Sequence, residues 1–149
     1  MAIQSETPYG AFNFLVSIGG DDPQDARAGF SEISGLSMEV QVIEYRAGND
    51  RTESPVNLPG LTRYSPVTLK RGLIGSLDLY EWITESAQSG PGNRRNVTIH
   101  LLNDEQQPAF TWKLRNAWVS KYSMSDLDAS SNDIAMEAIE IVHEGLVLE

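Results

Sequence analysis

Apolar and polar residues alternate along much of this chain, which is the pattern of β-strands that bury one face. The alternation is clear at 12–18 and again within a second β region at 30–45. The adjacent apolar residues Val42 and Ile43 interrupt it, as a β-bulge or a strongly bent strand would. A further strand is predicted around 67–71, so we expect the chain to be mainly β.

A β-hairpin is predicted from two apolar alternations, at 97–101 and 110–114, joined by a turn at 103–108. The residues expected to be exposed on this hairpin are Thr98, His100, Thr111, Lys113 and Arg115. The closing segment, 133–148, has apolar spacing that suits either a helix or a strand. Its cluster of β-branched residues favours a strand.

One helix is predicted at 76–89, because Ser76 is a suitable N-cap and Asp78 lies in the first turn. Its apolar stripe at helical spacing consists of Leu79, Trp82, Ile83 and Ala87. We expect the helix to pack on the outside of a sheet. The large residues expected to anchor the core are Phe14, Trp82, Trp112 and Trp118.

The predicted fold class is α+β and mainly β: an antiparallel β-sandwich or partial barrel with one flanking helix, in a single domain at 1–149. Between two of the predicted strands lies a segment, 47–64, with two prolines and two glycines among 18 residues. It is too long for a tight hairpin turn, so we predict a long loop. Such a loop is either a mobile part of the surface or a working part of the protein.

The net charge is −10, from 21 acidic and 11 basic side chains, and it disfavours nonspecific binding to nucleic acids. Two interpretations of this charge remain open. The acidic side chains keep the protein soluble, or some of them line a channel. There is no cysteine, so disulfides and thiolate metal sites are excluded. The first eight residues do not form a secretory signal, and no apolar run is long enough to span a membrane. We therefore expect the protein to be soluble when it is made.

No arrangement of residues predicts catalysis, a cofactor or a metal site. His100 and His143 lie far apart in the sequence, each in an apolar strand, and neither has a second histidine at ligand spacing. Neither a nucleophile elbow nor a phosphate-binding glycine loop is present. The pairs Asp126 with Asp128 and Glu137 with Glu140 are close in sequence, but that does not supply the opposed geometry of an acid and base pair.

A series of segments occurs in a fixed order along the chain: 9–16, 29–36, 44–50, 58–64, 67–72, 95–104, 112–118 and 141–146. Together they resemble the tail tube protein, or inner tube protein, of contractile phage tails and extracellular contractile injection systems. The resemblance implies a structural subunit and no enzyme. It implies hexameric rings whose sheets join between subunits into a continuous barrel, and head-to-tail stacking of these rings into a hollow conduit for cargo.

The resemblance also implies that 47–64 is an ordered loop that docks on the next ring. Its expected contact residues are Arg46, Asp50, Arg51, Glu53, Leu58, Pro59, Leu61, Arg63 and Tyr64. The candidates for the lumen wall lie on polar faces of predicted inner strands and are Glu39, Gln41 and Glu137. The implied partners are the sheath, the baseplate or hub, and tail-terminator proteins, with no specific nucleic-acid binding and no membrane insertion. The particle would be assembled in the cytoplasm and then released extracellularly or anchored through other subunits.

Two alternatives remain at this point. The chain could be a baseplate-proximal ring or a tube component like that of type VI secretion, with the same hexamer and other stacking partners. It could also be a monomeric β-barrel that binds a small ligand, or an enzyme on that scaffold.

Overall fold

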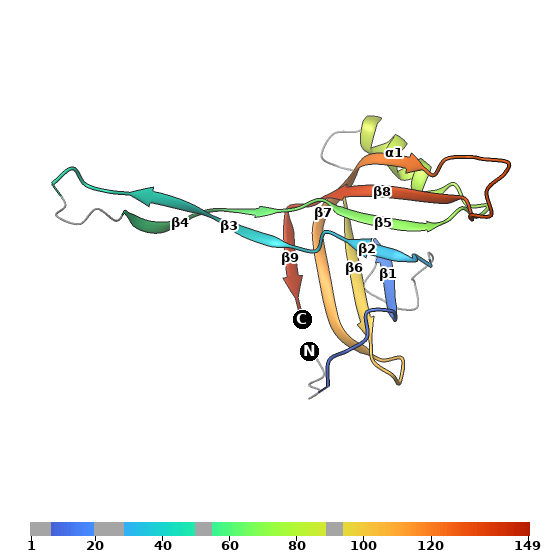
Figure 1. The fold of residues 1–149 in the computed structure, drawn as a ribbon, viewed down its shortest axis with the longest axis horizontal. Coiled ribbons are helices and arrows are strands. Elements are labelled where there is room, and N and C mark those ends of the chain that lie inside the picture. The colour runs from blue at the N-terminus through green and yellow to red at the C-terminus, as the bar shows by residue number, and fades with distance from the viewer. Residues whose placement is uncertain (1–6, 20–28, 50–54, 89–93) are drawn as a thin grey trace.

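The computed structural model describes residues 7–19, 29–49, 55–88 and 94–149. Within these residues the chain forms nine strands and one helix (Figure 1). They are β1 (Phe14–Ile18), β2 (Glu32–Ser34), β3 (Met38–Tyr45), β4 (Val56–Tyr64), β5 (Val67–Gly72), α1 (Asp78–Gln88), β6 (Arg95–Leu102), β7 (Pro108–Met124), β8 (Met136–Val142) and β9 (Gly145–Leu148). The prediction of a mainly β, antiparallel fold with one helix is confirmed.

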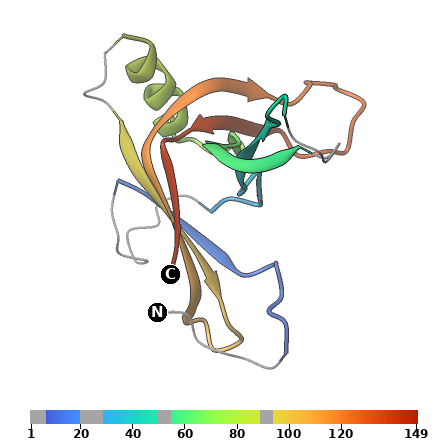
Figure 2. The same cartoon turned by 90° about the vertical axis from the view of Figure 1, so that its left-hand side faces the viewer.

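Seven strands form one sheet in the order β1-β6-β7-β8-β5-β2, with β9 beside β7. Strand β7 is 17 residues long and joins the two halves of this sheet, pairing with β6 and β9 first and with β8 afterwards. Its register shifts near Asn116, which has a positive φ of 52°, and again at Ser120. Such irregularities bend a strand, and Figure 2 shows β7 curving as it passes from one half of the sheet to the other.

Both halves of this sheet and α1 contribute side chains to one apolar core. On β5 and β8 every second residue is buried, including Leu69 and Ile139. The helix contributes Leu79 and Trp82, each 1% exposed. The predicted helix was slightly too long at its start, because the observed first turn begins at Asp78, whose carboxylate accepts a hydrogen bond from the Leu79 N–H at 3.0 Å.

The four expected core anchors differ in their positions. Trp82 is buried, and Phe14 and Trp112 are partly buried against the core cluster. The expectation is wrong for Trp118, which is only half-buried and lies outside that cluster. The bulge at Asn116 directs Ala117 and Val119 into the core, so Trp118 between them faces the other way.

The predicted hairpin is present as β6 and β7, with Ile99 opposite Trp112. Two of its residues expected to be exposed are instead buried: Thr98 is 1% exposed and His100 is 5% exposed. The His100 ring nitrogen Nδ1 lies 3.0 Å from the Thr111 hydroxyl, which gives the imidazole a partner inside the protein. Both faces of β6 are therefore covered, and the alternation that usually marks one solvated face is misleading here.

The closing segment is β-structure, as predicted, but it consists of two strands. β8 ends at Val142 and β9 begins at Gly145. Between them the chain turns at His143, so that β8 continues the half of the sheet formed with β5 and β9 continues the half formed with β6.

Strands β3 and β4 form a separate two-stranded ladder, which projects from the body as an arm (Figure 1). We define the arm as residues 38–49 and 55–64. The prediction of a loop throughout 47–64 was wrong for 56–64, which is strand β4. Pro59 and Gly60 suggested a loop, but they lie at a bulge: Pro59 pairs with Val42, and the next two residues of β4, Gly60 and Leu61, oppose the single residue Gln41 of β3. Proline is tolerated at such a place because no ladder hydrogen bond needs its missing N–H.

The base of the arm depends on Gly35, which links β2 to β3 with a positive φ of 91°. A Cβ added there would lie 2.2 Å from the Pro66 carbonyl oxygen, on the chain returning from β4 to β5. The two connections cross at a distance that only glycine permits.

We therefore expect Gly35→Ala to lower the free energy of unfolding by roughly 2 kcal/mol or more, from left-handed strain and overpacking together. Gly29→Ala is a matched control, since a Cβ at Gly29 meets nothing within 4 Å and its φ is not positive. Urea unfolding followed by tryptophan fluorescence measures both variants. Equal stability of the two would contradict the proposed close approach.

Candidate assembly interface

The arm exposes apolar side chains that no part of the described chain covers. Each is at least 46% exposed, and they are Met38, Val40, Val42, Ile43, Tyr45, Val56, Leu58 and Leu61. Single apolar residues on a surface are ordinary, but eight large ones exposed on the two faces of one projecting ladder mark an interaction site. The arm is therefore the strongest candidate for the functional surface.

The strand register sorts these residues into faces. In the outer half of the arm, Ile43 lies opposite Leu58 and Tyr45 lies opposite Val56, so all four point to the same side. We call these four residues the distal strip. Glu44 and Asn57, paired between them, point to the other side. The arm thus carries a compact apolar strip near its tip, backed by a polar face.

The contact residues expected from the sequence lie partly on this arm. Arg46, Leu58, Pro59, Leu61 and Arg63 are exposed on it. Asp50, Arg51 and Glu53 lie outside the described residues.

Tyr64 is half-buried at the base of the arm, where its ring contacts the His143 ring at a centroid distance of 5.3 Å. It holds the arm to the body and offers little surface for another subunit. Burial lowers the pKa of His143, whose Nδ1 lies 3.1 Å from the Gly145 carbonyl oxygen, so this contact involves a neutral ring at pH 7.

A second exposed apolar set lies around the other ends of β5, β7 and β8 and the start of α1. We call it the end patch; it consists of Leu73, Ile74, Leu77, Tyr80, Met124, Leu127 and Ile134. A hydrogen bond from the Leu73 N–H to the Ala135 carbonyl (2.8 Å) joins two of its segments. Figure 1 shows the arm and these strand ends at opposite ends of the long axis of the molecule. Sequence reasoning did not find this patch, because its residues come from four segments that only the fold brings together.

Of the three lumen candidates, Glu39 and Gln41 lie on the arm, on the face opposite Met38 and Val40. The Arg63 guanidinium lies beside them, paired in register with Glu39. The expectation for Glu137 is wrong, because its side chain is 2% exposed and points into the core. On β8 the inward positions include Glu137, whereas Glu140 lies on the outward face.

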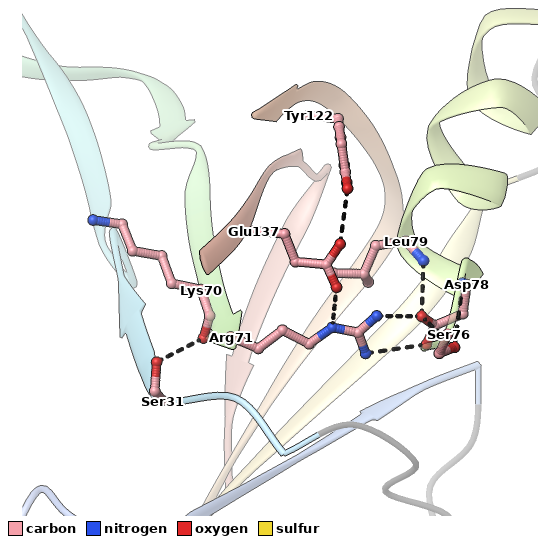
Figure 3. Close-up of polar contacts among 8 residues, drawn as sticks. All are labelled: Ser31, Lys70, Arg71, Ser76, Asp78, Leu79, Tyr122 and Glu137. Carbon is pink, nitrogen blue, oxygen red and sulfur yellow. Dashed lines mark hydrogen bonds and ion pairs between the residues drawn. The ribbon is translucent and has the colours of Figure 1, made fainter. Parts of the chain in front are cut away.

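Glu137 is part of a buried ion network, shown in Figure 3. Its carboxylate accepts a hydrogen bond from Nε of Arg71, directly opposite on β5, and another from the Tyr122 hydroxyl at 2.8 Å. The same guanidinium donates to both oxygens of Asp78 in the first turn of α1. The network fixes the start of the helix to three strands.

The charges of this network stabilise one another. Burial disfavours the charged guanidinium, but hydrogen bonds to Asp78 and Glu137 outweigh that effect and raise the pKa of Arg71. Burial also acts to raise the pKa of Asp78, yet hydrogen bonds from Arg71 and Ser76 dominate and lower it. Burial and the hydrogen bond to Glu137 raise the pKa of Tyr122. The guanidinium and the Asp78 carboxylate are therefore charged at neutral pH, with their partners in place.

The role of this network is structural. The network is polar and buried, but its groups are all engaged with one another. Among the described residues, no group of three histidine, aspartate or glutamate side chains could hold a metal ion. In the same part of the chain, no helix has the length and apolar character needed to cross a membrane.

The comparisons with known proteins agree with an assembly surface. A family model described as T4-like virus tail tube protein gp19 matches residues 10–147. The chain belongs to this tail tube family. No curated protein matches the sequence.

Solved structures of contractile injection systems resemble the tail tube chain over nearly its whole length. A chain of the sheath-tube complex of the extracellular contractile injection system PVC, in its extended state, is 30% identical, with a TM-score of 0.83 over 97% of this chain and 93% of that one. A chain of the anti-feeding prophage tube-terminating cap is 26% identical, with a TM-score of 0.83 over 100% and 95%. Hcp1 from Flavobacterium johnsoniae is 17% identical with a TM-score of 0.54, covering 91% and 93%, and shows a shared fold.

The buried network of the tail tube protein can be tested by removing its charges singly and together. We expect Arg71→Met to lower the free energy of unfolding by about 3–5 kcal/mol, because it leaves Glu137 buried without its ion partner. The double variant Arg71→Met, Glu137→Met should be more stable than the single variant, since no unpaired buried charge remains. Urea unfolding measures both, and a double variant less stable than the single one would contradict this account.

Proposed function

We propose that this tail tube protein forms hexameric rings that stack head to tail into the inner tube of a contractile injection system or contractile tail. The observation that carries the proposal is the arm, with its row of apolar side chains left uncovered by the described chain. Burial of such surface is the main driving force of association. An extended arm can reach a neighbouring subunit without any rearrangement of the core.

Contacts within a ring would use the edges of the sheet. β1 and β2 are the two ends of the strand order, and β2 is only three residues long. The outer edge of β9 is also unpaired among the described residues. Open edges can pair with strands of another copy, and closure of a ring removes them. A single chain forms only part of a barrel, and pairing of its open edges with other copies would complete that barrel.

The lumen wall would come from the side of the sheet that faces away from α1. On β8 and β5 this side carries Glu140 and Lys70, and on β7 it carries Lys121, opposite Glu140. Glu140, not Glu137, is therefore the lumen-wall candidate on β8. Glu39 and Gln41 remain the lumen-wall candidates on the arm. The resulting wall is polar and of mixed charge, which suits a conduit through which cargo passes without sticking.

The proposed partners are a sheath around the tube, a baseplate below it and a terminator above it. Related structures carry the descriptions sheath-tube complex, baseplate, sheath/tube terminator and tube-terminating cap. The role is structural and needs no catalytic residue. The tube would be part of a particle that is assembled in the cytoplasm and acts outside the cell or from a membrane anchor.

A baseplate-proximal ring is the second candidate function, favoured by the similarity to a chain of the anti-feeding prophage baseplate, at 26% identity and a TM-score of 0.81. Such a ring would share the hexamer but would not extend into a tube by itself. A type six secretion system protein resembles this chain at fold level only, at 13% identity and a TM-score of 0.58.

The arm gives a direct test of the tube. Residues 44–57 can be replaced by Asn-Gly, which joins the paired residues Ile43 and Leu58 by a two-residue hairpin turn and preserves their register. We expect this variant to remain folded, since the outer arm has no part in the core, and to form no tubes. Negative-stain electron microscopy and light scattering compare it with the unaltered protein at equal concentration.

Each outcome of this comparison decides a different point. Tubes from the unaltered protein and none from the shortened one support the proposal. Tubes of normal length from both would refute the role of the arm. Rings without tubes from the unaltered protein would favour the baseplate-proximal function, and a monomer at high concentration would contradict assembly by this chain alone.

A further inference from the structure

We infer that the end patch is the receptor for the distal strip of another copy of this chain. The inference rests on the proposed tube and adds the identity of the second half of the contact. It joins two surfaces at opposite ends of one molecule, the outer arm and the strand ends beside α1 (Figure 1).

The first argument is chemical match. The distal strip offers four apolar side chains on one side of the arm, Ile43, Tyr45, Val56 and Leu58, between 46% and 60% exposed. The end patch offers seven large apolar residues, of which Leu127 and Ile134 are the most exposed, at 79% and 76%. Both surfaces are uncovered within the described chain, and each would bury the other.

The second argument is shape. Beside the end patch, the connection between β7 and β8 encloses an open pocket of about 790 Å³. Its lining includes the patch residues Leu127 and Ile134 together with polar residues of the same connection. The arm, by contrast, is a narrow two-stranded projection (Figure 1). The projecting arm and an open hollow whose walls combine polar side chains with Leu127 and Ile134 are complementary in shape.

The third argument is charge. Residues 125–135 contain Asp126, Asp128 and Asp133 and no basic residue, so the rim of the pocket is acidic. Hydrogen bonds from the backbone N–H and the hydroxyl of Ser130 lower the pKa of Asp128, which keeps this carboxylate ionised. On the arm, the exposed Arg46 directly follows Tyr45 of the distal strip. Complementary charge at the rim favours this register of docking over others.

The fourth argument is symmetry. A contact between two different surfaces of identical chains is heterologous, so it leaves a free arm and a free patch at the two ends of every assembly. Each added layer presents the same surfaces as the layer before it. The placement at opposite ends of the long axis therefore gives the contact that repeated stacking needs.

The contact can be tested by cross-linking, because the chain contains no cysteine and any introduced pair is unique. The variant Leu58→Cys, Leu127→Cys carries one thiol on the distal strip and one on the end patch. Its two thiols lie at opposite ends of one copy, so a flexible bis-maleimide can join them only between copies. We expect a ladder of covalent multimers on a denaturing gel.

The matched control is Leu58→Cys, Glu105→Cys, whose second thiol lies in the exposed turn between β6 and β7, outside both surfaces. We expect this control and each single-cysteine variant to give no ladder. If tubes form but the strip links to Glu105→Cys and not to Leu127→Cys, the inference is overturned while the tube function stands. If the unaltered protein forms no assembly, the tube function fails and the inference fails with it.

A second pair of variants keeps the test decisive if the thiol substitutions disturb assembly. Leu127→Glu places a charge in the end patch, and Phe12→Glu places the same charge at a residue of similar exposure, 75% against 79%, outside both surfaces. We expect Leu127→Glu to abolish tubes and Phe12→Glu to leave them intact, with both variants folded by circular dichroism. Tubes of normal length from Leu127→Glu would overturn the inference.

Discussion

The organisation of this protein depends on apolar surface that the chain does not bury against itself. A folded subunit can leave isolated apolar residues in water, but a row of them along a projecting arm favours any partner that removes it from solvent. The arm holds Ile43 and Leu58 opposite each other at a distance from the core. Association with other copies would bury the apolar side chains of the arm that the folded chain leaves exposed.

The body of the subunit, in contrast, must be rigid, because it holds the arm at a fixed angle. Contacts at the base of the arm and a buried ion network farther along β5 provide this rigidity. Gly35 lets the two connections at the base of the arm cross closely, and the ring of Tyr64 packs against His143. Farther along β5, the buried Arg71 ties the first turn of α1 to β8, through its hydrogen bonds to Asp78 and Glu137. A rigid body and an exposed arm together suit a subunit that docks without changing shape.

Much of the fold could be predicted from the sequence, because the alternation along the strands and the helical stripe each reflect one buried face. The predictions of residue positions were wrong where something other than the local pattern, such as a partner on another strand or a bulge, determines where a residue lies. Glu137 fits an outward polar position, but a charge on the inward face is tolerated because Arg71 lies opposite it on another strand. Pro59 suggests a loop, yet it lies at a bulge of a two-stranded arm. A bulge that the local sequence pattern does not predict turns Trp118 outward.

The candidate interface was only half visible in the sequence. The arm is one continuous segment, and its resemblance to tail tube proteins identified it. The end patch is assembled from the ends of three strands and the start of the helix, with Leu73 and Leu127 far apart in the sequence. A surface of this kind has no linear signature, so only the folded chain reveals it.

Electron cryomicroscopy of the assembled protein tests the central claim most directly, at a resolution that resolves side chains. The account predicts a hollow tube in which the apolar residues of every arm are covered by another copy of the chain. A tube in which the arms extend into solvent, with the stacking contacts made elsewhere, would contradict it.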